Sequence, residues 1–561
     1  MRRTGYLVIL VLACGIYANP LSLAQQGDSS AAAKQPLEAK ISYLRQAVAY
    51  LDSEHPEADQ KWQGYKKSVE SLVMAAKSLS PQQDMTEIEK KADEMTRHIP
   101  LRLPSGPEGT GRFGACYATL KYDYKWDNLW KVSDHADVVV RFDEFDHRFV
   151  FWRGTSYIPC WATYKGAWYT NEFFERRGQR GGCDSMCEPM SDKQCRYSHV
   201  RIIESTDARV VVHWRYSPVD LNYKQPYRDP MTGWGDWVDE YYTIYPDSVC
   251  VRKATIHTGS PIKDWIEYQE SIVINQPGTI PEENINFDAV SFANLKGQSK
   301  TYTWTKDGGP GLKDPPDQPC IQVINFKNRY KPFTIVNPEG VSIKVYGGHG
   351  PNSFFNWWNH WPVAQEKSDT TVATSADKPS HSSLAHIEWK QYSQEGISRT
   401  WLKPSHDWPS NDPEYSQEGV SRTWLMLNGM TDKSAGELAP LGKSWLYPAQ
   451  LTLKKGGAVF SSEGYDQTQR AYVFNCEKMG KPAELACTLA AGADSPVINP
   501  AIVVKNWGKA DATLTINGKK VPQGRDFRLG HRRTIESQDL IVWFRIESTK
   551  PVDISISPAS D

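Results

Sequence analysis

Histidine and arginine occupy most of the alternate positions in two consecutive segments, residues 198–204 and 209–216, where Ile203 and Val211 fill the others. Together the segments supply His199, Arg201, Arg209, His213 and Arg215. Alternate residues of a β-strand point to the same face of a sheet, and the intervening residues here are largely apolar. The pattern therefore predicts two strands with one buried face and one face that carries cations and imidazoles. That polar face is either an ordinary solvated surface or a groove for an anionic ligand.

Two later segments, residues 249–257 and 265–274, continue the alternation. Their polar sets are Lys253, Thr255 and His257, followed by Trp265, Glu267, Gln269 and Ser271. The opposite sets are again apolar. We expect the four segments to form one meander, with Gln269 on the same polar face as His213.

A second group of residues lies in a short stretch that combines three tryptophans, two asparagines and a histidine. Trp357 and Trp358 could stack on the apolar faces of sugar rings. The imidazole of His360 titrates near neutral pH and could act as a general base or acid. Asn359 could donate a hydrogen bond to a carboxylate, and His381 follows nearby. The alternative is a loop that is simply packed by its tryptophans.

A third group lies near the end of an earlier predicted strand. Arg153 and Tyr157 occupy that strand end, where sites on β scaffolds often lie. Glu172 and Glu188 follow and form a candidate carboxylate pair, as a glycosidase would require. The alternative is that these residues form structural ion pairs, because the sequence does not give the separation of the carboxylates.

Hydrophobic periodicity predicts the elements that would position these residues. Between residues 36 and 100 the apolar residues recur at three- and four-residue steps, which predicts a short helical region. Beyond residue 107 the period changes to two. This change predicts a large antiparallel β-sandwich of the jelly-roll or supersandwich type over residues 108–440. Hairpins are expected to turn at residues 143–146 and 205–208.

A smaller C-terminal β-sandwich is expected over residues 444–561, where short strands follow one another closely. Asn517-Gly518 lies between two of these strands and has the sequence of a tight hairpin turn. Residues 392–402 recur almost unchanged as residues 415–425. Two copies are too few for a repeat architecture, and the role of the duplication stays open.

Composition narrows the classes of function. The chain has 65 basic and 66 acidic residues, so it lacks the basic excess of nucleic-acid-binding proteins, and we expect no nucleic-acid partner. Aromatic residues make up 12% of the chain, with 21 Trp and 27 Tyr. Such rings fit the cores of sheets, and they also form platforms for sugars.

The N-terminus has the pattern of an export signal. Two arginines precede an apolar stretch at residues 6–17, and the small residues Ser22 and Ala24 mark a cleavage site. We expect residues 1–24 to be a signal peptide and the mature protein to be secreted or periplasmic. A lipid anchor at Cys14, which would make an outer-membrane lipoprotein, is the alternative. We expect no transmembrane segment, because no stretch is long and apolar enough.

Of the ten cysteines, one lies in the expected signal peptide, which leaves nine and therefore at least one unpaired thiol. Export permits disulfides, and Cys476 with Cys487 is the expected pair because the two flank a predicted hairpin. Cys183, Cys187 and Cys195 could instead hold Zn²⁺, although they contain no C-x-x-C pair. Zn²⁺ or Ca²⁺ stays open as a cofactor, and the sequence identifies no set of metal ligands.

Several blocks of the sequence resemble those of large exported proteins of polysaccharide-degrading bacteria. They lie at residues 153–159, 191–199, 357–362 and 377–381. The plan of a helical start followed by β-sandwiches is similar to that of polysaccharide lyases of the ulvan-lyase-like, β-sandwich type, over most of the chain. The helical region is too short for the α-toroid of heparinase-like lyases. No catalytic motif of one family matches residue by residue, so the resemblance implies a fold and an activity and assigns no roles.

A polysaccharide lyase cleaves its substrate by β-elimination, and the reaction defines the groups that it needs. The proton on C5 of a uronic acid is removed once the neighbouring carboxylate is neutralised, and the leaving oxygen is then protonated. We assign His199 and His360 as base and acid candidates, with Tyr245 or Tyr157 as an alternative acid. The candidates for substrate binding are Arg153, Arg201, His213, Arg215, Gln269, Trp357, Trp358, Asn359 and His381. The expected partner is an acidic, uronate-containing polysaccharide, with or without sulfate groups.

Two other classes of function stay open. A glycoside hydrolase would use a carboxylate pair drawn from Glu172, Glu188, Glu240 and Glu267. A non-catalytic surface protein that binds glycans would need the aromatic residues and no titratable group. The product separates the three classes: β-elimination leaves an unsaturated uronate that absorbs in the near ultraviolet, hydrolysis does not, and binding leaves the polymer length unchanged. The sequence does not set the oligomeric state.

Overall fold

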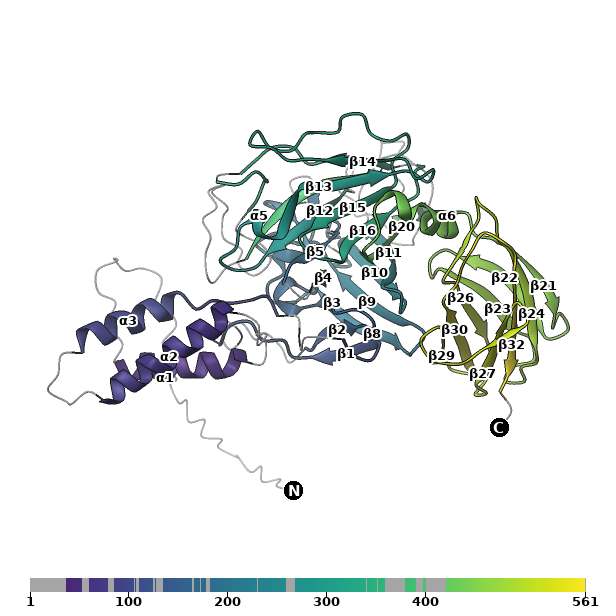
Figure 1. Ribbon diagram of the computed structural model, residues 1–561, viewed down its shortest axis with the longest axis horizontal. Helices are drawn as coiled ribbons and strands as arrows, with labels where there is room; N and C mark the ends of the chain where they lie inside the picture. Colours follow the sequence, from purple (N-terminus) through teal and green to yellow (C-terminus); the bar gives the residue numbers. More distant parts are fainter. Residues whose placement is uncertain are drawn as a thin grey trace, which may run out of the picture.

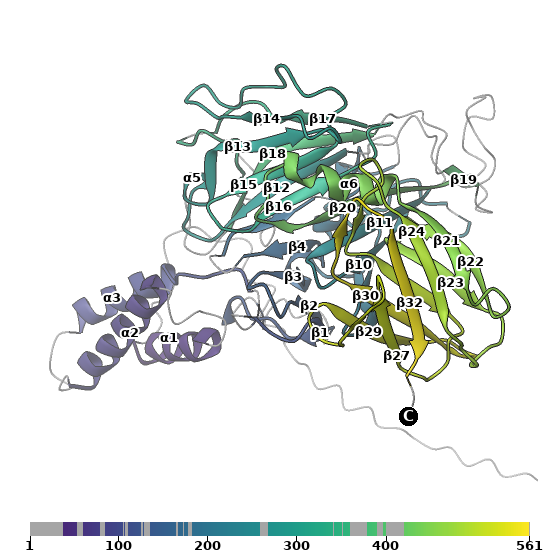
Figure 2. The same cartoon turned by 45° about the vertical axis from the view of Figure 1, so that its right-hand side comes forward.

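The computed structural model places most of the chain in β-strands (Figure 1). It describes residues 37–52, 60–78, 85–104, 106, 110–124, 127, 135–163, 166–171, 173–177, 182–229, 231–258, 268–339, 341–350, 352–358, 379–389, 397–399 and 420–559. Helices lie at one end, two large sheets form the centre and two smaller sheets lie at the other end, in both views (Figure 1, Figure 2). The predicted fold class is confirmed: a mainly β protein with a short helical start and a smaller C-terminal β-sandwich.

Several sequence predictions lie outside the described residues. They are the signal peptide with its alternative anchor at Cys14, the residues Glu172, Trp265, Glu267, Asn359 and His360, and much of the duplicated segments.

The helical region consists of three helices, α1 (Leu37–Leu51), α2 (Gln60–Ser78) and α3 (Thr86–Arg97). Each helix buries one apolar stripe, because its apolar residues recur every three or four positions. The shared core is Leu44, Val69, Leu72, Ala92 and Met95. Two shorter helices, α5 (Pro281–Asn284) and α6 (Ala439–Leu446), lie between strands. None of the helices in the described part of the chain is both long and apolar enough to cross a lipid bilayer.

The first large sheet has eight strands. In spatial order these are β1 (Gly114–Ala118), β2 (Asp137–Arg141), β3 (Arg148–Phe151), β4 (Pro159–Ala162), β5 (Trp168–Thr170), β12 (Tyr268–Asn275), β18 (Ser380–Trp389) and β17 (Val341–Val345). Neighbouring strands are antiparallel throughout.

The second large sheet has ten strands and is also antiparallel. In spatial order these are β14 (Ser299–Tyr302), β13 (Ile285–Ala293), β15 (Ile321–Phe326), β16 (Lys331–Ile335), β20 (Val420–Thr431), β11 (Val249–Thr258), β10 (Trp237–Ile244), β9 (Val210–Tyr216) and β8 (His199–Ser205), and β19 (Ile397–Arg399) pairs with β20. Two small strands, β6 (Arg176–Arg177) and β7 (Met186–Cys187), pair with each other beside this sheet.

Strand pairing confirms both predicted hairpins and corrects the predicted meander. β2 pairs with β3, and β8 pairs with β9. β12, however, pairs with β5 and β18 in the first sheet. Gln269 is therefore buried and does not share a face with His213. Consecutive strands are usually neighbours, which favours a meander, but the period of a strand does not encode the sheet that it joins.

The space between the two large sheets contains a buried ion pair. Glu240 on β10 and Arg252 on β11 are joined by two N–O contacts of 2.7 Å each. Tyr216 and Tyr242 donate hydrogen bonds to Glu240, and Arg252 donates to Gln269 Oε1 at 2.5 Å. The two charges are thus satisfied by hydrogen bonds although both side chains are fully buried.

The C-terminal part has two five-stranded sheets. One contains β21 (Gln450–Lys455), β24 (Leu485–Ala490), β32 (Val552–Pro558), β27 (Ala512–Ile516) and β28 (Lys519–Val521). The other contains β22 (Phe460–Asp466), β23 (Ala471–Cys476), β26 (Ala501–Lys505), β30 (Gln538–Phe544) and β29 (Phe527–Arg533). A two-stranded ribbon of β25 (Val497–Ile498) and β31 (Glu547–Ser548) completes this part.

The hairpin predicted at Asn517-Gly518 is confirmed. It joins β27 to β28, and both of its central residues have positive φ, 48° and 76°. A two-residue turn of this kind requires left-handed backbone at both positions, which asparagine and glycine tolerate. Cys476 and Cys487, by contrast, lie on strands of different sheets and are free thiols, so the expected disulfide is absent there.

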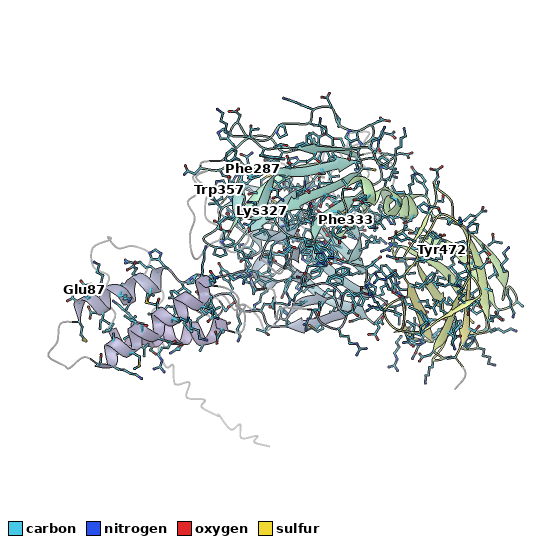
Figure 3. The ribbon with its side chains drawn as sticks, in the orientation of Figure 1. Glu87, Phe287, Lys327, Phe333, Trp357 and Tyr472 are labelled. Carbon is cyan, nitrogen blue, oxygen red and sulfur yellow. The ribbon has the colours of Figure 1, made fainter. Side chains whose placement is uncertain are left out.

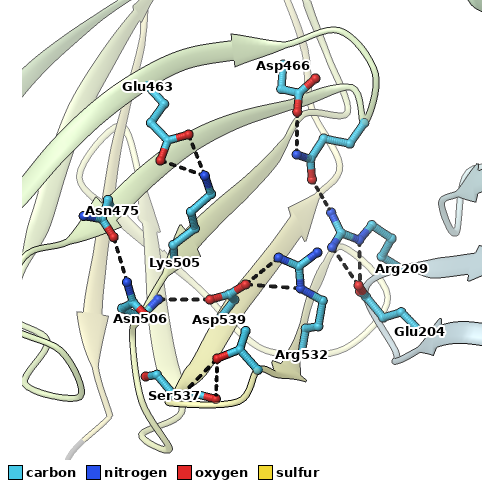
Figure 4. Close-up of polar contacts among 12 residues, drawn as sticks. Glu204, Arg209, Glu463, Asp466, Asn475, Lys505, Asn506, Arg532, Ser537 and Asp539 are labelled. Atoms are coloured by element: carbon cyan, nitrogen blue, oxygen red, sulfur yellow. Dashed lines mark hydrogen bonds and ion pairs between the residues drawn. The ribbon is translucent and has the colours of Figure 1, made fainter. Parts of the chain in front are cut away.

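The C-terminal part packs against the β8–β9 hairpin of the second sheet. Arg209 forms a buried ion pair with Glu204 at 2.7 Å and donates to Gln469 Oε1 at 2.8 Å (Figure 4). Arg470 pairs with Asp247 at 2.6 Å. Around these contacts lies an apolar cluster of Ala208, Tyr245, Ala471, Val473, Ala501, Val503, Ile541 and Trp543.

Candidate functional site

Polar side chains form cross-strand rows on one face of the strands β8, β9, β10 and β11. In one row His199 faces Arg215, which faces Asp239 and then Thr255. In the next row Arg201 faces His213, which faces Tyr241 and then Lys253. Trp237 and His257 form a third pair. The structure therefore brings together four of the predicted site residues, His199, Arg201, His213 and Arg215, with the polar set Lys253, Thr255 and His257.

Asp239 is the centre of this cluster. His213 Nε2 lies 2.7 Å from its Oδ1, His257 Nε2 lies 3.3 Å from its Oδ2, and Arg215 Nη1 lies 3.2 Å from Oδ2. The side chain of Asp239 is 14% exposed. Burial would raise the pKa of Asp239, but the hydrogen bonds from His213 and His257 and the Arg215 guanidinium hold that pKa well below its usual range. Asp239 is therefore a carboxylate at neutral pH.

The hydrogen bonds of His213 define its tautomer. Arg201 Nε donates to His213 Nδ1 at 3.1 Å, because a guanidinium has no acceptor. Nε2 of His213 must then carry the hydrogen that is donated to Asp239. Tyr241 stacks over the imidazole at a centroid distance of 4.4 Å and an angle of 13°. His213 is thus a buried residue that positions Asp239 and has no free nitrogen.

His257 differs from His213 in its exposure. Its side chain is 32% exposed, and its Nδ1 has no hydrogen-bond partner among the described residues. With Nε2 beside the Asp239 carboxylate and Nδ1 without a partner among the described residues, the ring has the arrangement of a histidine that a carboxylate orients. Tyr241 lies two residues from Asp239 on the same strand and is 37% exposed. An imidazole, a phenol and two guanidiniums thus share one face.

His199 lies at the edge of the same face and is exposed. Burial, together with the neighbouring His135, lowers the pKa of His199. The His135 and His199 rings are 6.3 Å apart. The imidazole of His199 is therefore neutral at neutral pH and able to accept a proton.

The structure places three other sequence candidates away from this face. Arg153 forms a 2.5 Å ion pair with Asp137 and donates to the carbonyl of Leu120. It therefore links the turn at residues 153–155 to strand β2. Tyr157 is buried, and its pKa is raised by that burial. Tyr245 is buried against the C-terminal part, where its hydroxyl donates to the carbonyl of Gln469 at 2.5 Å.

The tryptophan segment lies beside the first sheet. Trp357, which is labelled in Figure 3, is only 4% exposed. The same segment carries Phe354 and Phe355. Trp358 and His381 exchange backbone hydrogen bonds of 2.9 Å, and their rings stack at 5.1 Å. This pair lies on a different sheet from Asp239, so the structure does not bring the two sequence groups together within the described residues.

Glu188 belongs to a separate group of carboxylates. Burial raises the pKa of Glu188 to about 8; the carboxylates of Glu175 and Glu270 add to the shift, and the Lys193 ammonium opposes it. Glu270 also lies 3.1 Å from His386 Nε2. Glu188 is therefore protonated at neutral pH, which is the form that a structural, hydrogen-bonding carboxyl adopts in a low-dielectric setting.

Glu188→Gln is expected to make stability less dependent on pH. A raised folded-state pKa contributes stability that is complete below the unfolded pKa of about 4.3 and is lost as pH rises through about 8. The neutral amide removes that loss. The difference in melting temperature between the variant and wild type should therefore shift by about 3 °C in favour of the variant as pH rises from 5 to 9. Glu339→Gln, at an exposed position, is the control. Parallel curves for Glu188→Gln and wild type would contradict the assignment.

No group of three or more histidine, cysteine, aspartate or glutamate side chains suited to a metal ion occurs among the described residues. Cys183, Cys187 and Cys195 carry free thiols and do not form such a group. The Zn²⁺ hypothesis for these three residues thus gains no support from their arrangement.

Sequence reasoning missed the residues that organise the cluster. Asp239, Tyr241 and Trp237 alternate along β10, and that alternation was the available signal. His257 was recognised as part of the polar set but was given no role. A carboxylate between two histidines is visible only once the cross-strand register is known.

No family model and no curated protein matches this chain. Among solved structures, the heparan sulfate lyase HepC from Pedobacter heparinus matches with a TM-score of 0.22 and 9% identity, over 81% of this chain and 60% of that one. A xanthan lyase from Paenibacillus matches with a TM-score of 0.20 and 8% identity, over 94% of this chain and 56% of that one. The chain thus spans 60% or less of the length of either structure. These similarities are too low to carry an argument about activity.

Proposed function

We propose that this protein is a secreted enzyme that depolymerises an acidic, uronate-containing polysaccharide by β-elimination. The observation that carries the proposal is the geometry around Asp239, whose carboxylate lies 3.3 Å from the partly exposed His257 and 3.2 Å from Arg215. An imidazole beside a carboxylate and a guanidinium, on one face of the sheet, supports the assignment of His257 as the base.

The chemistry of β-elimination fits these groups. The uronate carboxylate binds Arg215, whose positive charge stabilises the enolate-like state that forms when the C5 proton leaves. His257 takes that proton on Nδ1, and the C5–H electron pair forms the C4=C5 double bond. The bond between C4 and the bridging oxygen then breaks, and the oxygen takes a proton from the hydroxyl of Tyr241. Asp239 stays ionised and balances the imidazolium.

The remaining residues of the face support this arrangement. Arg201 is exposed and supplies a second guanidinium for a carboxylate or sulfate group. His199 offers a second neutral imidazole at the edge of the face. His360, which the sequence pairs with His199, stays a proposal because it lies outside the described residues.

The test is the absorbance of the unsaturated uronate. The purified protein is offered a panel of uronate polymers, sulfated and unsulfated, and the near-ultraviolet absorbance and polymer length are followed. The proposal expects the absorbance to rise with at least one polymer and polymer length to fall. Shortening without absorbance would establish the hydrolase. Binding without shortening would leave a glycan-binding protein.

A further inference from the structure

An aromatic ledge, formed by Tyr197, Tyr223 and Trp237, borders the cluster around Asp239. The centroid of the Tyr197 ring lies 6.1 Å from that of Trp237 and 6.5 Å from that of Tyr223. Trp237 is the cross-strand partner of His257, so the ledge begins directly beside the proposed base. All three side chains are partly exposed. The rings therefore extend the polar face in one direction.

The first ring of the ledge is held in place by a buried aspartate. Asp192 is fully buried and accepts hydrogen bonds of 2.7–2.8 Å from the backbone N–H groups of Arg196, Tyr197 and Ser198. Three such bonds fix the loop that carries Tyr197 before any ligand arrives. A group that is already ordered loses little conformational entropy on binding.

A second buried aspartate holds the loop of Tyr223 in the same way. Asp220 accepts backbone hydrogen bonds of 2.8–2.9 Å from Asp184, Asn222 and Lys224. Tyr223 itself has a positive φ of 62°, and its hydroxyl accepts the N–H of Gln194 at 3.0 Å. A left-handed backbone at tyrosine costs energy, and such strain is typically retained where the position of a side chain serves a ligand.

Guanidinium groups accompany the rings of the ledge. Arg215 lies over Trp237 at 4.9 Å from the ring centroid, and Arg196 lies over Tyr223 at 4.6 Å. Arg196 is exposed, whereas the carboxylates of Asp192 and Asp220 are buried and already bonded. Flat rings suit the apolar face of a sugar, and guanidinium groups suit its carboxylate or sulfate oxygens.

We propose that the aromatic ledge is a second sugar subsite, which binds the unit of an acidic polysaccharide next to the unit that reacts. Tyr197, Tyr223 and Trp237 stack on the sugar, and Arg196 binds its anionic group. The inference rests on the proposed function for the identity of the polymer, but it concerns binding and requires no cleavage.

The experiment measures binding and cleavage separately. Binding of the full-length protein is measured by native electrophoresis in gels that contain ulvan, as a sulfated uronate polymer, or polygalacturonate, as an unsulfated one. Tyr223→Ala and Arg196→Ala should each weaken binding by about tenfold, which corresponds to about 1.4 kcal/mol. Tyr223→Phe keeps the ring and should bind like wild type. Tyr447→Ala removes an aromatic side chain that is exposed elsewhere and is the matched control.

The outcomes separate the ledge from the reaction. Loss of binding in the ledge variants, with His257→Ala still bound, supports the subsite even if no polymer is cleaved. Wild-type binding by Tyr223→Ala and Arg196→Ala would overturn it, whether or not the enzyme is a lyase. If neither polymer slows the migration of the wild-type protein in the gel, the proposed subsite is overturned as well. Where cleavage occurs, the ledge variants should raise KM and leave kcat close to wild type.

Discussion

Alanine at His257 is expected to lower kcat by about 10²–10⁴-fold while leaving polymer affinity nearly unchanged. The reason is that His257 combines partial exposure, a nitrogen without a partner among the described residues and a carboxylate 3.3 Å from its other nitrogen. Removal of the imidazole removes the base but none of the guanidinium groups. The initial rate of absorbance increase measures kcat, and native electrophoresis in polymer gels measures affinity.

A matched control for this variant exists in the C-terminal part. His531 Nε2 lies 3.2 Å from Asp511 Oδ1, so these two residues form a second histidine–aspartate pair. His531 is far from the site in sequence and belongs to another sheet. His531→Ala should keep the wild-type kcat. Asp239→Asn should lose kcat as His257→Ala does, because the carboxylate orients the ring. If His257→Ala keeps the wild-type kcat, His257 is not the base, and His199 or His360 becomes the candidate.

Glu240→Ala is expected to lower the free energy of unfolding by about 3–5 kcal/mol. Arg252 would then stay fully buried without a counter-charge, and Tyr216 and Tyr242 would lose the acceptor of their hydroxyls. Denaturation in urea, followed by tryptophan fluorescence, measures the change. The double variant Glu240→Leu with Arg252→Met should recover much of the loss, since it leaves no buried charge.

An exposed ion pair supplies the control for this experiment. Lys505 and Glu463 are 2.6 Å apart on the surface of the C-terminal part (Figure 4). Glu463→Ala should change the free energy of unfolding by about 0–1 kcal/mol, because solvent screens that pair. Equal effects of Glu240→Ala and Glu463→Ala would show that the interior pair carries no special share of the stability.

Local patterns in the sequence predict the strands of this protein well. The two-residue period of residues 198–216 predicts the β8–β9 hairpin, and Asn517-Gly518 predicts the turn between β27 and β28. These features depend on side-chain alternation and on backbone preferences of single residues, which are local properties. The alternation also indicates which side chains share a face, and this is why His199, Arg201, His213 and Arg215 could be grouped.

Long-range pairing explains what the sequence did not predict. Gln269 alternates like a member of the polar face. Strand β12 belongs to the first sheet, however, so the side chain of Gln269 points into the interior. Tyr245 directly follows strand β10 of the second sheet, but the C-terminal part covers it. Asp239 has an ordinary position in β10, and only the cross-strand register brings it into contact with His213, Arg215 and His257. None of these partners is close in sequence.

The packing of the C-terminal part on the β8–β9 hairpin has a consequence for synthesis of the chain. Ala208 and Tyr245 are covered by Ile541 and Trp543, which the ribosome adds about 300 residues later. At roughly 5–20 residues per second, this interval lasts about 15–60 s. During that time the apolar patch and the ion pair of Arg209 have no partner surface. The nascent chain therefore exposes an apolar sheet surface for much of its translation, at a stage when chaperones can bind it.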